Sequence, residues 1–339
     1  MTSSAGRMVS ASDIESLSEM LTEIAPGTIT RNVDLRTLTR WRIGGPAAIL
    51  AEPTSEDQLS QMLEVISKTR VPLCVLGGGS NVLFDSRGFN GIILLIGERL
   101  SAVHVDDTRI SAEAGVSVPD LARLTGRLAL TGIEHTVGIP GTLGGLVLMN
   151  GGSLRRGIGE HVESVRCVTL DGTPLLLSHE ECQFAYRSSR LQELDAIVVS
   201  IDLKLQPGDF STINAEMDAI VASRAARFPQ DLPSCGSTFL SDPKMYAEVG
   251  APGHAIEESG LKGLRHGDAQ ISPQHANFFV NLGDATSDDV LWLIAVARNT
   301  VRERTGYSMD CEVRFIGTDG VVRPTHEVAL ERWGHDLVA

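Results

Sequence analysis

Two glycine-rich segments carry the residue types that bind phosphate without a charged side chain. The first, Gly77-Gly-Gly-Ser-Asn81, follows the short apolar run Pro72–Leu76, and the second extends from Gly138 to Gly152. Clustered glycines let backbone N–H groups approach a phosphate closely, which suits an acidic chain. Neither segment is a Walker A motif or a GxGxxG dinucleotide fingerprint. Together they indicate a nucleotide bound in another way, although each segment alone is also typical of an ordinary turn.

Three single residues stand where they can do chemistry. Arg187 follows an aromatic residue in an apolar region, where it can bind a substrate carboxylate through two hydrogen bonds or form a surface salt bridge. Ser237 lies in a tight turn, where it can donate a proton, act as a nucleophile or cap the turn. The turn is not a GxSxG elbow, because Phe239 replaces the second glycine. Glu312 has apolar neighbours, which predicts a buried carboxylate that is paired or functional.

A cysteine and a histidine form a second candidate set. Cys235 can act as a nucleophile with His275, but an isolated cysteine more often serves as a small buried residue. His275 precedes the apolar run Phe278–Asn281, and a ligand role for it stays open. None of the 9 histidines pairs as HxxxH or HxH with a nearby acid, so we expect no metal site. A monovalent cation could still assist.

Composition narrows the class of protein. The formal net charge is −14 and aromatic residues make up 4% of the chain, so nucleic acid and anionic membranes are not expected partners. There is no apolar run of about 20 residues for a membrane span, and no apolar core of a signal peptide. The 5 cysteines are scattered and lack CxxC spacing, which predicts reduced thiols and a cytoplasmic protein.

Periodicity predicts the elements that position these residues. The 339 residues suffice for two or three domains. We expect an extension over 1–28 with a weakly amphipathic stretch, three α+β regions over 29–97, 98–207 and 208–320, and a tail over 321–339. Helices are predicted after Thr54 and near 119–130, 213–228 and 288–304. Strands are predicted over 72–76, 197–205 and 311–316, with a hairpin of 162–170 and 174–177 around Asp171-Gly172.

Eight short motifs together resemble one family, the flavin-dependent UDP-N-acetylenolpyruvoylglucosamine reductases of peptidoglycan synthesis and cell-wall biogenesis. The likeness runs from about Asn32 to Gly317 in the order and spacing of the family. The motifs occupy residues 41–46, 76–83, 138–145, 186–189, 235–239, 260–263, 272–277 and 312–314.

The resemblance implies an α+β fold with FAD as cofactor. A two-domain FAD-binding module of the vanillyl-alcohol-oxidase (PCMH) type, over 29–97 and 98–207, would precede a C-terminal α+β substrate-binding domain over 208–320. That last domain looks like the shorter form of the family. The FAD contacts then fall on Gly77, Gly78, Gly79, Ser80, Asn81, Gly138, Ile139, Pro140, Gly141, Thr142, Gly144, Gly145 and Asn150.

The resemblance also implies a reaction and its catalytic residues. NADPH would reduce FAD, and flavin N5 would pass a hydride to the enolpyruvyl group of UDP-N-acetylglucosamine enolpyruvate, giving UDP-N-acetylmuramate. Arg187 and a protonated Glu312 would stabilise the enolate, and Ser237 would donate the proton. Tyr186, Arg265 and His275 fall where the substrate binds. We expect a monomer or a weak homodimer.

Two departures from the family pattern keep other functions open. Gly151–Gly157 and Leu240-Ser241 differ from the residues common in the family, and the second change removes two polar groups near the substrate. A divergent flavoenzyme that reduces another sugar nucleotide therefore remains an alternative. A flavin-binding protein without turnover is a lesser one, because such a protein has no need of a proton donor at Ser237.

Overall fold

The computed structural model of the chain describes residues 9–334, which fall into two compact units. Of the described residues, unit 1 combines 9–33, Ala47–Gly77 and Asn90–Ile213. Unit 2 combines Asp34–Pro46, Gly78–Phe89 and 214–334. Each unit therefore gathers segments that are far apart in the sequence. The finer domain boundaries at 28, 97, 207 and 320 stay predictions.

A small sheet and two helices make up the first layer of unit 1. The strands are ordered β1-β2-β5-β3, with bounds Ile29–Asp34, Pro46–Ala51, Phe89–Leu95 and Leu73–Leu76, and β3 runs parallel to β5. Helix α2 (Glu56–Ile66) buries the four apolar positions that predicted it, Leu59, Met62, Leu63 and Ile66. It begins one residue later than expected, because the side chain of Ser55 rather than Thr54 caps it.

The weakly amphipathic stretch near the N-terminus is a helix of the unit 1 core. Helix α1 (Ala11–Ile24) begins with a capping box between Ser10 and Asp13. It buries Ile14, Leu17 and Leu21 and packs on α2. This part of the predicted extension is therefore attached by apolar burial.

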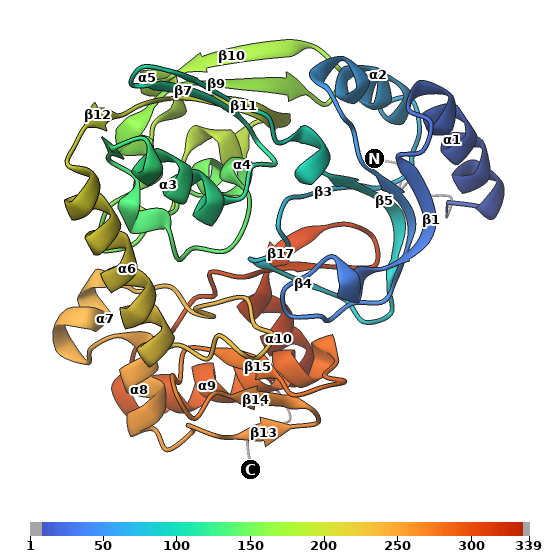
Figure 1. Cartoon of the computed structure of the whole chain (residues 1–339). Helices are drawn as coiled ribbons and strands as arrows, with labels where there is room; N and C mark the ends of the chain where they lie inside the picture. The colour runs from blue at the N-terminus through green and yellow to red at the C-terminus, as the bar shows by residue number, and fades with distance from the viewer. Residues whose placement is uncertain (1–8, 335–339) are drawn as a thin grey trace. The chain divides into compact units, whose positions relative to one another are not determined.

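The second layer of unit 1 is a five-stranded antiparallel sheet. Its order is β10-β9-β11-β7-β6, with bounds Pro174–Ser178, Val162–Thr169, Ala196–Lys204, Arg109–Glu113 and Val103–Asp106. The hairpin predicted around Asp171-Gly172 is confirmed as β9 and β10, with Gly172 at φ +91°. The short helix α4 (Leu143–Leu148) packs against β7 and β11 (Figure 1). The remaining elements are α3 (Val118–Arg127), α5 (His179–Cys182), β8 (Leu130–Thr131) and β12 (Gln206–Pro207).

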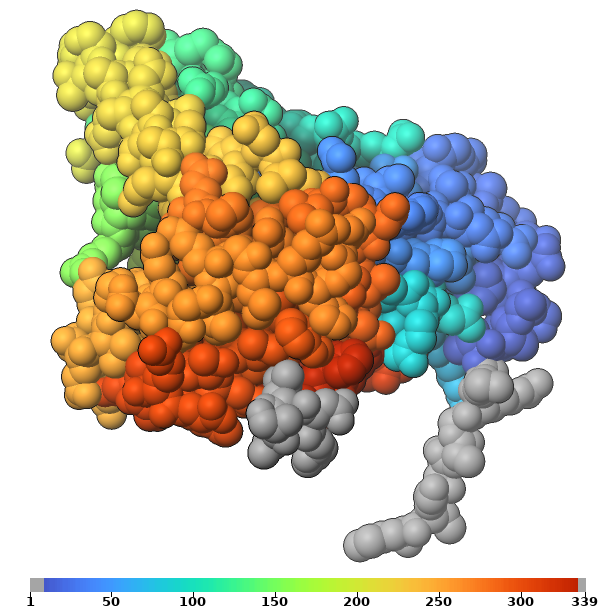
Figure 2. All heavy atoms as spheres, turned by 90° about the horizontal axis from the view of Figure 1, so that it is seen from below, coloured from blue at the N-terminus to red at the C-terminus, as the bar shows by residue number. Residues whose placement is uncertain are grey.

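Unit 2 packs helices against two three-stranded sheets. One sheet, β13-β14-β15 (Arg265–His266, Ala269–Ile271, Phe279–Asn281), lies against α9 (Ser287–Thr305). The other is β17-β16-β4 (Val322–Pro324, Arg314–Ile316, Val82–Phe84), in which β4 runs parallel to β16. The other helices are α6 (Phe210–Arg227), α7 (Pro243–Glu248), α8 (Pro252–Glu258) and α10 (Thr325–Trp333). Trp41 anchors this core and donates its indole N–H to the Phe279 carbonyl at 2.7 Å. The orange and red segments form one continuous surface in the space-filling view (Figure 2).

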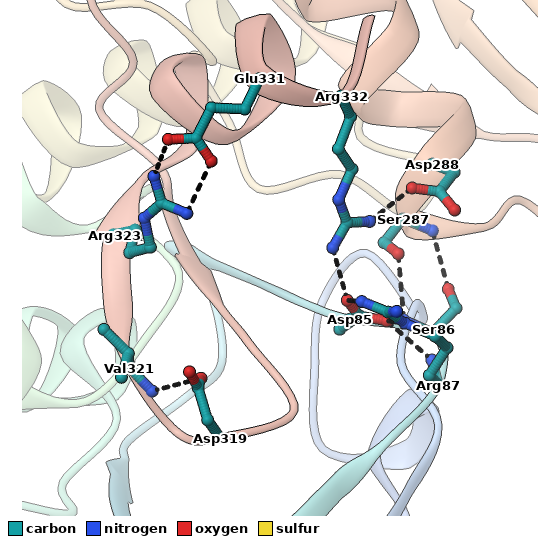
Figure 3. Close-up of polar contacts among 10 residues, drawn as sticks. All are labelled: Asp85, Ser86, Arg87, Ser287, Asp288, Asp319, Val321, Arg323, Glu331 and Arg332. Carbon is teal, nitrogen blue, oxygen red and sulfur yellow. Dashed lines mark hydrogen bonds and ion pairs between the residues drawn. The ribbon is translucent and has the colours of Figure 1, made fainter. Parts of the chain in front are cut away.

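A buried carboxylate ties the turn after β4 to the C-terminal helix. The Asp85 side chain is 2% exposed and accepts hydrogen bonds from Arg87 and Arg332, each at 2.7 Å (Figure 3). Ser86 and Ser287 add two bonds, because each backbone N–H donates to the other hydroxyl oxygen. Burial alone would raise the pKa of Asp85, but the hydrogen bonds from both arginines outweigh it and hold that pKa well below its usual range.

Asp85→Asn is expected to lower the free energy of unfolding by about 3 kcal/mol at pH 7, because it leaves Arg332 beside a neutral amide. A carboxyl with a depressed native pKa contributes stability above its unfolded pKa of about 4 and loses it as the pH falls. Thermal unfolding should therefore show that the difference in unfolding free energy between wild type and variant becomes smaller from pH 7 to pH 3.5. Asp319→Asn is the matched control, because Asp319 is exposed and its carboxylate accepts a turn N–H from Val321. A gap that does not change with pH would contradict this account.

Candidate functional site

The first glycine segment connects β3 to β4 and keeps backbone donors available. Gly79 has φ +58°, and its carbonyl accepts the Arg40 N–H at 3.0 Å. A Cβ added at Gly79 would lie 2.2 Å from the Leu38 carbonyl oxygen, so only glycine fits there. Within residues 9–334, the N–H groups of Gly78 and Ser80 donate to no protein acceptor. The segment therefore presents free N–H groups on a backbone that is itself fixed.

The second glycine segment leads into the N-terminus of α4. Thr142 is the N-cap residue, yet its side chain makes no capping hydrogen bond. Gly144 donates to the Ala114 carbonyl at 2.8 Å, and a Cβ there would come within 2.8 Å of the Ala114 Cβ. A Cβ at Gly77 would lie 2.4 Å from Thr142 Oγ1. These glycines let the backbone lie close to Ala114 and Thr142, at the segment where a bulky anion would bind.

The free donors of the first segment fit a phosphate group of a dinucleotide cofactor such as FAD. Free backbone N–H groups bind phosphate oxygens without a cationic side chain, and the start of a helix adds a favourable partial charge. The fit rests on the unpaired donors and on the missing Cβ atoms, both of which follow from the glycines. The individual cofactor contacts predicted from the sequence stay predictions.

A tight turn in unit 1 presents Arg187. Ala185 and Ser188 exchange two backbone hydrogen bonds, so Tyr186 and Arg187 form the tip of the turn. Arg187 has φ +52°, and its Nη2 donates to the Gly152 carbonyl at 3.4 Å. Tyr186 is 69% exposed. The guanidinium of Arg187 is thereby held beside the end of the second glycine segment.

Backbone pairing in unit 2 places Ser237 and Glu312 on adjacent extended segments. Phe239 pairs with Cys311 in an antiparallel bridge, and the Glu312 N–H donates to the Thr238 carbonyl at 2.9 Å. The two candidate residues are therefore one position apart in register. Both are half-buried, so the expectation that Glu312 is buried is met only in part.

Asn81 and Asn277 fix the segments that carry Ser237 and Glu312. Asn81 Nδ2 donates to the Glu312 carbonyl at 3.3 Å, which joins that residue to the first glycine segment. The buried Asn277 accepts the Phe239 N–H at 2.9 Å and donates to the Phe239 carbonyl at 3.0 Å. Two different sequence motifs contain these asparagines, but only the structure shows what Asn277 contacts.

Cys235 is a structural residue and not a nucleophile. It is buried, and its Sγ donates to the Val82 carbonyl at 3.4 Å. Burial raises the pKa of the Cys235 thiol to about 12, so the thiol stays protonated at neutral pH. The reading of Cys235 as a small buried residue is therefore confirmed, and that of a nucleophile paired with His275 is wrong.

The two predicted substrate-binding residues of unit 2 have different surroundings. His275 packs edge-on against Phe228 and Phe278, each at 5.1 Å, and burial lowers its pKa. Phe278 is the bridge partner of Ser237, so His275 lies near the candidate proton donor. Arg265 is exposed on β13 and forms an ion pair with Asp268.

Two features near the candidate residues escaped the sequence reasoning. The guanidinium groups of Arg224 and Arg227 lie over the Phe228 ring, at 5.1 and 5.2 Å, and that ring stacks on Phe278. In unit 1, His135 is fully buried, and neither ring nitrogen has a hydrogen-bond partner within the described residues. Burial lowers the pKa of His135 to about 4, so the ring is neutral at physiological pH. The buried His135 has no short-range sequence pattern, whereas Arg224 and Phe228 have the i, i+4 spacing of neighbours on a helix face.

No helix within residues 9–334 is both long and apolar enough to cross a membrane. Over the same residues, the His, Cys, Asp and Glu side chains form no group of three or more that could hold a metal ion.

Comparison with known proteins identifies relatives of both parts of the chain. The family model for the C-terminal domain of UDP-N-acetylenolpyruvoylglucosamine reductase matches residues 228–316, and the FAD binding domain model matches residues 47–178. UDP-N-acetylenolpyruvoylglucosamine reductase 1 of Corynebacterium glutamicum is 51% identical over 301 residues, covering 89% of this chain and 90% of the relative. The reductase of Caldanaerobacter subterraneus is 36% identical, covering 90% of this chain and 98% of the relative.

A solved structure extends the similarity to the fold. The crystal structure of the reductase (MurB) from Thermus caldophilus matches with a TM-score of 0.70 and 32% sequence identity. The match covers 85% of this chain and 98% of that chain. The two family-model matches include both glycine segments, Ser237 and Glu312.

Proposed function

The chain belongs to the UDP-N-acetylenolpyruvoylglucosamine reductase family and contains an FAD-binding domain, and on that premise we propose which of its residues carry out the reaction. The reductase converts the enolpyruvyl group of UDP-N-acetylglucosamine enolpyruvate to the lactyl ether of UDP-N-acetylmuramate, a precursor of peptidoglycan. NADPH is the source of electrons. The observation that carries the assignment is the backbone register that holds Ser237 and Glu312 one position apart in unit 2.

Charge and proton supply define the roles of three residues. Bound FAD supplies the hydride that reduces the terminal carbon of the enolpyruvyl group. Negative charge then develops on the adjacent carbon and its carboxylate, where the Arg187 guanidinium and a protonated Glu312 stabilise it. The Ser237 hydroxyl donates the proton that completes the reduction. Each role matches the donor capacity of that side chain.

The cofactor and substrate contacts follow from the same premise. The N–H groups of the two glycine segments bind the FAD diphosphate, which the free donors of Gly78 and Ser80 support. Tyr186 and His275 contact the substrate, Tyr186 because it is exposed beside Arg187 and His275 because it lies near Ser237. Arg265 can bind a substrate phosphate only by leaving Asp268.

The working state of the protein completes the proposal. We place the enzyme in the cytoplasm, where NADPH is available and where its five cysteines remain the free thiols of the structure. It acts as a monomer or a weak homodimer. Residues 29–97 and 98–207 serve as the FAD-binding subdomains, and residues 208–320 bind the substrate.

Anaerobic stopped-flow absorbance tests the reaction directly. The holoenzyme is reduced with NADPH, mixed with UDP-N-acetylglucosamine enolpyruvate, and followed near 450 nm, about where oxidised flavins absorb. We expect rapid reoxidation without oxygen. A flavin that stays reduced would assign the chain to another sugar nucleotide, in line with the changes at Gly151–Gly157 and Leu240-Ser241. A purified protein without flavin would overturn the catalytic account.

A further inference from the structure

Arg187 occupies a turn whose geometry arginine does not adopt by preference. The Ala185 and Ser188 N–H groups donate to each other's carbonyls at 2.9 and 3.1 Å, which closes the turn around Tyr186 and Arg187. The φ of +52° at Arg187 lies in the left-handed region, which is unfavourable for a residue with a Cβ. Such a conformation persists only where the surroundings hold it.

Asn150 connects this turn to two neighbouring segments of unit 1. Its Nδ2 donates to the Ala185 carbonyl at 2.8 Å, and its Oδ1 accepts the Gly159 N–H at 2.9 Å. The network thereby fixes which end of the amide is oxygen and which is nitrogen. Both ends of the side chain are engaged by backbone.

Two glycines, which have no Cβ, leave the space that the Asn150 amide occupies. A Cβ added at Gly157 would lie 2.6 Å from Asn150 Oδ1, and one at Gly159 would lie 2.8 Å from the same atom. Asn150 itself has φ +40°, which asparagine tolerates better than most residues. The absence of a Cβ at Gly157 and Gly159, together with the left-handed backbone of Asn150, therefore lets the Asn150 amide lie beside Ala185.

Gln192, which is exposed, and Ser189, which is buried, add further bonds near the turn. Gln192 Nε2 donates to the carbonyls of Leu148 and Arg187 at 3.1 and 3.2 Å, and Ser189 Oγ donates to Leu148 at 2.6 Å. Gln192 is exposed and Asn150 is half-buried, and the bond of Asn150 to Gly159 is more buried than its bond to Ala185. Among the described contacts, only Asn150 holds the Ala185 carbonyl from a third segment.

We propose that Asn150 is the positioning residue for Arg187, because its amide holds the Ala185–Ser188 turn in the geometry from which the guanidinium meets the substrate. The inference rests on the proposed function. It gives Asn150 a role that acts through Arg187, in place of the flavin contact that the sequence predicted.

Asn150→Asp is the sharpest test, because the carboxylate keeps the size of the amide and the acceptor for Gly159 but loses the donor for Ala185. We expect the FAD content and the rate of flavin reduction by NADPH to stay within about twofold of wild type. The single-turnover reoxidation by UDP-N-acetylglucosamine enolpyruvate should slow 10- to 100-fold, roughly what misplacement by about 1 Å costs. Asn90→Asp is the control, since Asn90 is exposed and its side chain, within residues 9–334, bonds to the Val9 carbonyl alone.

Two readouts separate positioning from general loss of structure. Lowering the pH from 8 to 5.5 protonates part of the introduced carboxyl, which restores a donor, so the ratio of variant to wild-type reoxidation rates should rise several-fold. In an Arg187→Lys background, Asn150→Asp should slow the single-turnover reoxidation by less than about a further threefold, because both changes remove the same interaction.

Hydrogen exchange of the holoenzyme tests the geometry without turnover. The Ala185 and Ser188 amides should exchange at least tenfold faster than wild type in Asn150→Asp. In Asn90→Asp they should exchange at the wild-type rate. Loss of FAD, or a parallel fall of both half-reactions, would overturn the inference in favour of a flavin contact or a folding role. Unchanged exchange would overturn it as well. If wild type itself fails to transfer hydride, the proposed function fails, while the exchange result still decides whether Asn150 holds the turn.

Discussion

Ser237→Ala is expected to leave flavin reduction by NADPH intact and to slow reduction of the enolpyruvyl substrate by about 10³-fold. The change removes one hydroxyl from a half-buried turn, and general-acid catalysis typically contributes 10²- to 10⁴-fold. Ser237 lies in unit 2, among segments fixed by Asn277 and by the Phe278 bridge, and alanine disturbs neither. Stopped-flow measurement of the two half-reactions separates the two effects.

Ser234→Ala, three residues earlier in the same segment, is the matched control for this variant and should leave both half-reactions unchanged. If both half-reactions survive in Ser237→Ala, another group donates the proton. If both fall together, Ser237 supports the structure and does not act as the acid. Only a selective loss of the second half-reaction agrees with the assignment.

Gly79→Ala is expected to abolish FAD binding. The added Cβ would lie 2.2 Å from the Leu38 carbonyl oxygen and 2.9 Å from the Thr39 Cα, both of which belong to backbone and cannot rotate away. The first glycine segment must then move, which displaces the free donors of Gly78 and Ser80. The purified variant should lack the flavin absorbance band near 450 nm, and added FAD should not restore it.

Gly260→Ala separates steric displacement from backbone strain. Gly260 has φ +74°, similar to the +58° of Gly79, but nothing lies within 4 Å of the position of its Cβ. Both variants carry a comparable conformational penalty, on the order of 1 kcal/mol. We expect Gly260→Ala to retain a full complement of FAD. Equal flavin loss in the two variants would show that strain alone is responsible.

Elements with local sequence patterns could be predicted well. The helix predicted near 288–304 is confirmed as α9, which begins at the Thr286 cap and ends at the left-handed Gly306, because both ends depend on neighbouring residues. The predicted strand over 311–316 is shorter than expected and begins at Arg314. Residues nearer Cys311 instead pair with Phe239 across the chain, and no local pattern specifies that partner.

The candidate site shows the same division between local and distant information. The glycine segments could be recognised because glycine has a direct backbone consequence. The left-handed turn at Arg187 could not, because arginine does not favour that conformation and the holding groups come from Leu148 and Asn150. The roles of Arg187, Ser237 and Glu312 came from the family resemblance, since each side chain alone was compatible with an ordinary structural role.

The pairing of β4 with β16 determines when unit 2 can be completed during synthesis. Asn81 and Glu312, which flank these strands, are 231 residues apart. At about 5–20 residues per second, a ribosome needs on the order of 10–50 s to make the intervening chain. For most of that interval β4 is outside the ribosome while its partner strand is still unmade. A nascent chain that stalls before Glu312 therefore exposes an unpaired β4, which gives a chaperone or a protease a defined target in the unfinished protein.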